Sequence, residues 1–127
     1  LTSAAGYLVT DALALSDSTS TTITDMGTTG LARGKITATA KGTASGQVTL
    51  YTADDYAAPN YIYIKNTDAT ATDYIYIYDD TTSGDPIVLQ LAGGDWAFMP
   101  TIADKTLKAY ATTSGTIVEF MVYGTDQ

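Results

Sequence analysis

Residues 61–80 read YIYIKNTDATATDYIYIYDD, in which tyrosine alternates with isoleucine on both sides of a polar segment. A period of two is typical of a β-strand, because successive side chains point to opposite faces of the sheet. Ile62 and Ile64 therefore share one face of the first run, and Ile75 and Ile77 share one face of the second. Isoleucine has no polar atom, whereas tyrosine combines a large apolar ring with a hydroxyl that needs water or a partner. We expect the isoleucines in the core and the tyrosines on the surface or at an interface.

The polar segment KNTDATATD, residues 65–73, predicts that the two runs pair as antiparallel neighbours. Such a pair would gather the tyrosines on one face: Tyr61, Tyr63, Tyr74, Tyr76 and Tyr78. Three roles for this face stay open. The first is a solvated sheet face stabilised by cross-strand aromatic pairs, the second is a protein–protein contact, and the third is a surface on which sugar rings stack.

The rest of the chain also favours strands. Threonine, alanine, glycine and tyrosine dominate, while the helix-favouring residues Glu, Lys, Arg and Gln are scarce. The segments with a period of two are 35–39, 48–52, 61–64, 74–78, 87–91, 95–99, 107–112 and 116–123. Ser-Gly steps in residues 43–46, 81–84 and 112–115 are typical of hairpin or corner turns. The sequence predicts an all-β fold, an antiparallel, jelly-roll-like β-sandwich of about eight strands.

The apolar faces of these segments predict the core. The core candidates are Ile62, Ile64, Ile75, Ile77, Leu89, Leu91, Trp96, Phe98, Val118, Phe120 and Val122. Trp96 and Phe98 share one face of their segment. In residues 116–123, Val118, Phe120 and Val122 share one face, and Glu119 lies on the other face with Ile117, Met121 and Tyr123.

Residues 1–30 have a different character. Tyr7, Val9 and Leu13 share one parity, which is typical of an extended strand, and residues 16–24 are almost entirely Ser, Thr and Asp. We expect an extended N-terminal arm and linker over residues 1–30 and a β-sandwich domain over residues 31–127, with the three apolar residues contacting a neighbouring subunit. The alternative is an ordinary first strand followed by a surface loop.

Composition excludes several classes of function. With 6 Lys+Arg against 14 Asp+Glu, the formal net charge is −8, so nucleic acid is not an expected partner. No stretch approaches the roughly 20 apolar residues that span a bilayer, so we expect no membrane partner.

The absence of histidine and cysteine removes the common nucleophile systems and most zinc and copper sites. Glu119 is the only glutamate, and the aspartates cluster in turns without the spacing of a calcium loop. We predict no enzymatic activity, no cofactor and no metal site.

Residues 87–124, IVLQLAGGDWAFMPTIADKTLKAYATTSGTIVEFMVYG, resemble the C-terminal half of small β-sandwich virion proteins of tailed bacteriophages. Those proteins run through a strand, a glycine-rich turn, an aromatic-bearing strand that ends near proline, a strand reading roughly LYA, and a last strand after SGT. The corresponding places here are Leu89 and Leu91, Gly93 and Gly94, Trp96 with Pro100, residues 107–111, and residues 114–116. The stretch YIYIKNTDA, residues 61–69, resembles the preceding strand of the same pattern.

This resemblance implies a capsid decoration or cement protein on the virion surface. Its expected partners are the major capsid protein and copies of itself, as a homotrimer. The alternative from the tyrosine-rich face is an extracellular protein, either a secreted carbohydrate-binding module with a glycan ligand or an adhesin-type surface subunit. The predicted interface residues are Tyr61, Tyr63, Tyr74, Tyr76, Tyr78, Tyr7, Val9 and Leu13.

Overall fold

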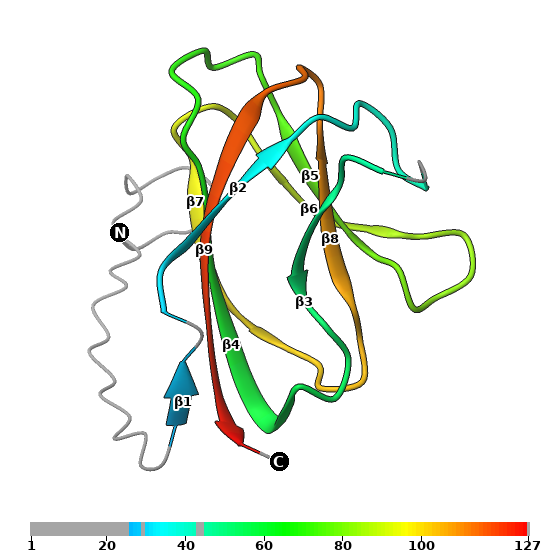
Figure 1. Ribbon diagram of the computed structural model, residues 1–127, viewed down its shortest axis with the longest axis vertical. Helices are drawn as coiled ribbons and strands as arrows, with labels where there is room; N and C mark the ends of the chain where they lie inside the picture. Colours follow the sequence, from blue (N-terminus) through cyan, green and yellow to red (C-terminus); the bar gives the residue numbers. More distant parts are fainter. Residues whose placement is uncertain (1–25, 29, 43–44, 127) are drawn as a thin grey trace, which may run out of the picture.

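The chain forms two antiparallel sheets packed face to face (Figure 1). A computed structural model describes residues 26–28, 30–42 and 45–126. The strands are β1 (Met26–Thr28), β2 (Ala32–Ile36), β3 (Val48–Tyr51), β4 (Tyr56–Asn66), β5 (Ile75–Asp79), β6 (Ile87–Leu91), β7 (Trp96–Thr101), β8 (Leu107–Ala111) and β9 (Thr116–Asp126). Among the described residues, no helix is long and apolar enough to cross a membrane.

The larger sheet has the order β1-β9-β4-β7, and β2 also pairs with β9. β1 lies beside the end of β9 and β2 beside its beginning, so the two short strands follow each other along one side of β9. The smaller sheet has the order β3-β8-β5-β6. From β2 onward, every connection crosses between the sheets except the β5–β6 hairpin. This is a jelly-roll arrangement, so the predicted fold class is confirmed.

The predicted pairing of the two tyrosine–isoleucine runs is wrong. The first run lies in β4, which pairs with β7 and β9, and the second lies in β5, which pairs with β6 and β8. The runs therefore belong to opposite sheets. Their isoleucines, Ile62 and Ile64 from one sheet and Ile75 and Ile77 from the other, are fully buried in the core between the sheets. Alternation thus predicted the buried face of each run correctly but carried no information on its neighbours.

Most core candidates are buried or pack against the core. Leu91, Val118 and Val122 are buried, and Leu89 and Phe120 are partly buried against the same cluster.

Trp96 and Phe98 contradict the prediction, because their side chains are 65% and 53% exposed. In β7 it is Ala97 and Met99 that pack against the core. The reason is the register, in which Ala97 is paired with Ile64 and Met99 with Ile62. Directly opposed residues point to the same face of a sheet, so Ala97 and Met99 point inward together with the isoleucines of β4. Trp96 and Phe98, which alternate with them, therefore point outward.

A buried asparagine holds one end of the sandwich together. Asn66, at the end of β4, donates from Nδ2 to the carbonyl oxygens of Asp73 (2.7 Å) and Leu91 (3.1 Å), and its Oδ1 accepts from the backbone N–H of Asp68 (3.1 Å). These bonds join the larger sheet to the β4–β5 loop and to the end of β6. A polar side chain in the core is stable when its donors and acceptors are satisfied in this way.

Candidate functional site

The outer face of the larger sheet carries an open aromatic surface. Tyr61 of β4 stacks on Phe98 of β7, with ring centroids 5.7 Å apart and 2° between the planes, and Tyr123 of β9 meets Phe98 edge-on at 5.9 Å. Tyr63 is paired with Phe98 on one side and Met121 on the other. We call this surface the platform and define it by Tyr61, Tyr63, Trp96, Phe98, Met121 and Tyr123. Exposed apolar patches of this kind mark interaction sites.

A charged row borders the platform. The Glu119 carboxylate accepts from Nε of Arg33 at 2.8 Å and lies 2.8 Å from Nη2 of the same residue, and the Tyr63 hydroxyl donates to its other oxygen at 3.3 Å. The hydrogen bond from Arg33 is the main reason that the pKa of Glu119 is lowered. Burial, followed by the Glu119 charge, raises the pKa of Tyr63.

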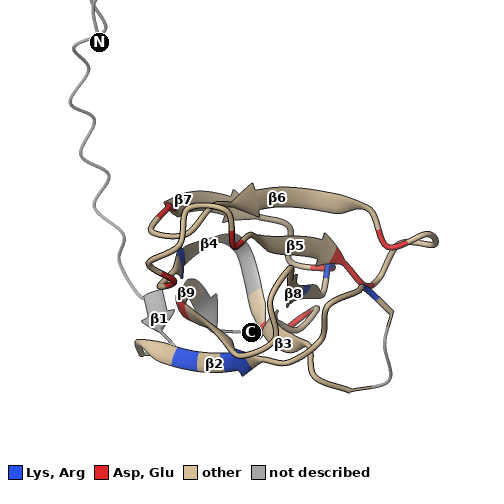
Figure 2. Cartoon of the chain, turned by 90° about the horizontal axis from the view of Figure 1, so that it is seen from above, with Lys and Arg blue, Asp and Glu red and all other residues tan. Residues whose placement is uncertain are grey.

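The outer face of the larger sheet has an excess of positive charge. Lys35 of β2 is paired with Ile117, and Lys65 of β4 with Glu119 and Trp96, so both lysines lie on this face beside Arg33. Glu119 is its one acidic side chain within the described ranges. The face is therefore basic, although the whole chain has a formal net charge of −8. Figure 2 shows basic residues along β2, and most acidic residues at loops and strand ends.

The apolar surface continues past β7, the edge strand of the larger sheet. Ile87 and Val88 on the edge strand β6 and Ile102 after β7 are 48%, 49% and 64% exposed. A cleft of about 230 Å³ lies between these strands, and Val88 and Ile102 are among its lining residues. Pro100 leaves β7 without one backbone donor, a feature of edge strands that blunts pairing with other chains. Among the described strands, none pairs with this side of the sandwich, which is also apolar.

The outer face of the smaller sheet carries a second group of tyrosines. Tyr76 stacks on Tyr110 at 5.0 Å, and Tyr74 and Tyr78 add tilted contacts to Tyr76 and Tyr110 at 6.3 and 6.0 Å. These rings are half-buried or buried against one another. This group therefore leaves far less aromatic surface open than the platform does.

Tyr78 is only 1% exposed, which contradicts its predicted place on a surface face. The β2–β3 loop covers it, since the backbone of Gly42 hydrogen-bonds to its hydroxyl. The neighbouring Lys41 Nζ donates to the carbonyl oxygens of Gly84 (2.7 Å) and Asp85 (2.9 Å) and so fastens this loop to the β5–β6 hairpin. Burial raises the pKa of Tyr78. Its hydroxyl thus serves the packing of the fold.

The structure therefore divides the predicted interface tyrosines. Tyr61 and Tyr63 lie on the platform, Tyr74 and Tyr76 lie on the opposite outer face, and Tyr78 is buried. Tyr7, Val9 and Leu13 lie outside the described residues.

Sequence reasoning missed Trp96 and Phe98 as surface residues. It also did not join Met121 and Tyr123 to the tyrosine face, although it placed them on the face that carries Glu119. The available signal was the small residue Ala97 between Trp96 and Phe98, which fits a core position opposite a bulky isoleucine.

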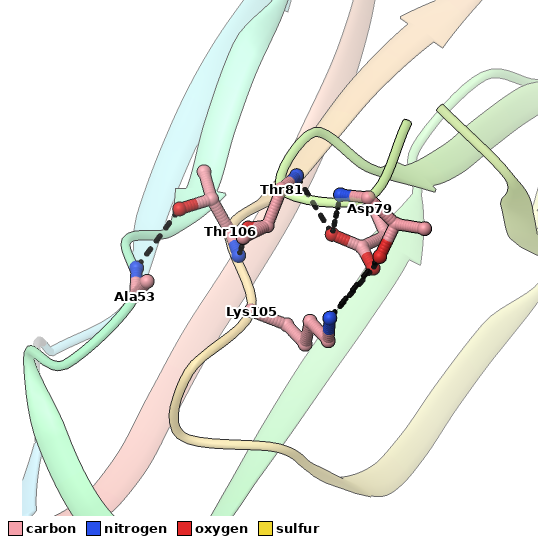
Figure 3. Close-up of polar contacts among 6 residues, drawn as sticks. Ala53, Asp79, Thr81, Lys105 and Thr106 are labelled. Atoms are coloured by element: carbon pink, nitrogen blue, oxygen red, sulfur yellow. Dashed lines mark hydrogen bonds and ion pairs between the residues drawn. The ribbon is translucent and has the colours of Figure 1, made fainter. Parts of the chain in front are cut away.

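Three loops meet at one end of the sandwich and hold one another in place (Figure 3). The backbone N–H of Ala53 donates to Oγ1 of Thr106 (2.9 Å), and the Thr106 N–H donates to Oγ1 of Thr81 (2.6 Å). The buried Asp79 carboxylate accepts from the Thr81 N–H (2.8 Å) and lies 3.7 Å from Nζ of Lys105. The β3–β4, β5–β6 and β7–β8 loops therefore form one connected unit.

Asp79 is ionised more readily than an ordinary aspartate. Its burial alone raises the pKa. That effect is outweighed by hydrogen bonds from the Thr82 hydroxyl (2.5 Å) and the Thr81 N–H (2.8 Å) and by the charge of Lys105, so the pKa of Asp79 is lowered from its ordinary value of 3.8.

Three exposed carboxylates project from the same end: Asp54, Asp55 and Asp104. We call them the acidic end. The Asp54 N–H donates to the Ala103 carbonyl oxygen (2.7 Å), which holds two of the three loops together. No ion pair of these carboxylates occurs among the described residues, whereas Asp79 and Asp80 lie near Lys105 and Lys108. Nor do three or more acidic side chains in the described part of the chain gather closely enough to hold a metal ion.

Comparison with known proteins gives a likeness of fold. No protein-family model matches the sequence, and no curated protein matches it. The structure is similar to a solved chain from a study reporting that Bacillus endospore appendages form a novel family of disulfide-linked pili. The TM-score is 0.52 at 15% sequence identity, and the match covers 87% of this chain and all of the other. At this identity the likeness concerns the fold alone.

Proposed function

We propose that this protein is a non-catalytic subunit that self-assembles into an extracellular surface appendage, with the platform forming part of its subunit interface. The observation that carries this proposal is the exposure of Trp96 and Phe98, 65% and 53%, beside a sheet edge that none of the described strands pairs with. Protein interfaces are enriched in tryptophan, tyrosine, phenylalanine, methionine and arginine, and the platform with the adjacent Arg33 contains all five. In a monomer, the described residues would leave this surface open to water.

The likeness in fold to a pilus protein supports an assembling subunit. That protein is described as disulfide-linked, whereas the 127 residues of this chain contain no cysteine. The contacts proposed here are therefore non-covalent, formed by apolar burial and by pairs of charges. We expect the assembly to resist reducing agents and to dissociate in denaturant.

The expected capsid role finds no support in these comparisons. The solved chain described above comes from a study of pili, and a major capsid protein as partner stays a prediction from the sequence resemblance alone. The surface-subunit alternative agrees better with the fold likeness.

A glycan-binding role is the second candidate, and one observation favours it. Trp96 is an exposed ring with Lys65 beside it in register, and Lys65 is in turn paired with Glu119. An aromatic platform with a few polar groups at its border is a common way to hold a sugar ring. Titration with a glycan panel, followed by tryptophan fluorescence, tests this role. A saturable shift that the Trp96→Ala variant lacks would support it.

The experiment for the main proposal is light scattering of the purified full chain over a range of concentrations, with negative-stain electron microscopy of the same samples. We expect particles whose mass grows with concentration, seen as filaments, both with and without a reducing agent. A mass that stays at the monomer value would contradict self-assembly. A closed trimer at every concentration would favour the capsid role instead.

A further inference from the structure

Charges of opposite sign occupy separate surfaces of this molecule. On the outer face of the larger sheet, Arg33 is the ion-pair partner of Glu119, and neither Lys35 nor Lys65 forms an ion pair within the described residues. At one end of the sandwich, the acidic end carries exposed carboxylates without cationic partners in the described ranges. One copy therefore presents a basic, aromatic flank and an acidic end.

We infer that the platform of one copy docks on the acidic end of a second copy, with Trp96 and Phe98 central in the contact and Lys35 and Lys65 facing the acidic end. This inference rests on the proposed self-assembly and names the surface that covers the platform.

Charge complementarity selects this partner surface. Two copies that each carry a net charge of −8 repel at long range, so a stable contact must bring opposite charges together locally. A contact between two platforms would set Lys35 and Lys65 of one copy against the same residues of the other. A contact between the platform and the acidic end sets Lys35 and Lys65 opposite carboxylates, and Glu119, the acidic side chain of this face, is already paired with Arg33.

The acidic end is also preorganised for docking. The hydrogen bonds from Asp54 to Ala103 and from Ala53 to Thr106 fix the loops that carry its carboxylates. A rigid surface loses little conformational entropy when it binds.

The two surfaces differ, so the contact is heterologous, and every copy has one of each. Repetition of such a contact gives an open filament unless the rotation closes a ring. The proposal therefore explains why assembly continues beyond a dimer.

Charge reversal in the full chain tests this pairing. The face variant carries Lys35→Glu and Lys65→Glu, the end variant carries Asp55→Lys and Asp104→Lys, and the combined variant carries all four changes and keeps the native net charge. Thr39→Glu with Gln90→Glu, which adds two negative charges at exposed positions outside both surfaces, is the control. Circular dichroism and urea unfolding confirm that each variant is folded, and light scattering gives the lowest concentration at which filaments form.

We expect the face variant and the end variant each to raise that concentration by about a hundredfold or more, because like charges then oppose each other at the contact. The combined variant should form filaments near the native concentration. So should an equimolar mixture of the face and end variants, since each supplies the surface that the other requires. The control with Thr39→Glu and Gln90→Glu should assemble like the native chain.

The outcomes separate the two proposals. If the native chain forms filaments and the face and end variants do so equally well, the inferred pairing is wrong while self-assembly stands. If the face and end variants do not form filaments, and neither the combined variant nor the mixture forms them either, the inferred pairing is also wrong. If only deletion of residues 1–25 blocks assembly, that segment of a neighbour covers the platform instead. A native chain that never assembles overturns both proposals.

Discussion

The two outer faces of the sandwich contain similar aromatic side chains but expose them differently. On the smaller sheet, Tyr76 and Tyr110 stack on each other, and the β2–β3 loop covers Tyr78. On the larger sheet, Trp96 and Phe98 remain more than half exposed on an edge strand. Aromatic content alone therefore does not identify an interaction surface. What matters is how much of each ring remains exposed after its contacts within the same chain are made.

The difference follows from the connections between strands. The β2–β3 loop passes over the smaller sheet and is held there by Lys41, whose ammonium group contacts Gly84 and Asp85. The platform is left open over β7, where the sheet ends. The small-sheet face thus stabilises the fold, whereas we propose that the platform stabilises the assembly.

The largest expected effect comes from removing the exposed rings of the platform. We expect Trp96→Ser with Phe98→Ser to raise the concentration needed for filament formation by at least about a hundredfold, because buried aromatic residues dominate interface energies. The urea-unfolding free energy should change by less than about 1 kcal/mol, since exposed side chains contribute little to it. The matched control, Tyr74→Ser with Tyr76→Ser, should leave assembly intact. If both double variants raised the concentration needed for filament formation equally, the proposed difference between the two faces would be wrong.

Tyr78 tests the role of the smaller sheet. We expect Tyr78→Ala to lower the free energy of unfolding by about 3 kcal/mol, because it leaves a cavity beneath the β2–β3 loop. Tyr78→Phe should cost about 1 kcal/mol, the usual value of one lost hydrogen bond. Urea titration followed by circular dichroism measures both. A loss below about 1 kcal/mol for the alanine variant would show that the loop does not depend on this ring.

Asp79 tests how the loops at the acidic end are held. Since the pKa of Asp79 is lowered in the folded chain, its charge stabilises the fold fully above the ordinary value of 3.8, and this stabilisation is lost as the pH falls below it. We expect Asp79→Asn to lower the free energy of unfolding by about 1.5 kcal/mol at pH 7. The difference from the native chain should shrink below about pH 4. A difference that stays constant down to pH 2.5 would contradict a charge-based role.

The smallest effect is expected at the border of the platform. In Arg33→Gln, the pKa of Glu119 should rise toward its ordinary value of 4.5, because the hydrogen bond from Arg33 is the main cause of its lowering. The urea midpoint should change little, since the Arg33 side chain is 69% exposed and an ion pair open to water contributes little to stability. NMR titration of the Glu119 side chain measures the shift. An unchanged pKa would mean that Arg33 does not hold the carboxylate in solution.

The buried faces of strands could be predicted from the sequence because alternation is local. The isoleucines of β4 and β5 and the valines of β9 are buried as their spacing indicates. Glu119, Met121 and Tyr123 share the opposite face, as expected. Each of these predictions depends only on residues two apart, whose side chains point the same way in any strand.

Trp96 shows where this reasoning fails. Both faces of β7 carry apolar side chains, so alternation alone does not show which face is buried. The choice depends on the register with β4, where Ile64 is paired with Ala97. That register is a long-range property of the sheet.

The sequence by itself thus determined the fold class, most strand positions and the inward isoleucines, because the period of two and the turn residues act over short distances along the chain. Only the tertiary structure decided which strands are neighbours, that the tyrosines divide between two faces, and that Trp96 and Phe98 face outward. The physical reason is that sheet pairing joins segments far apart in the chain, such as β2 with β9. Their partners are selected by the packing of the whole core and not by the local pattern.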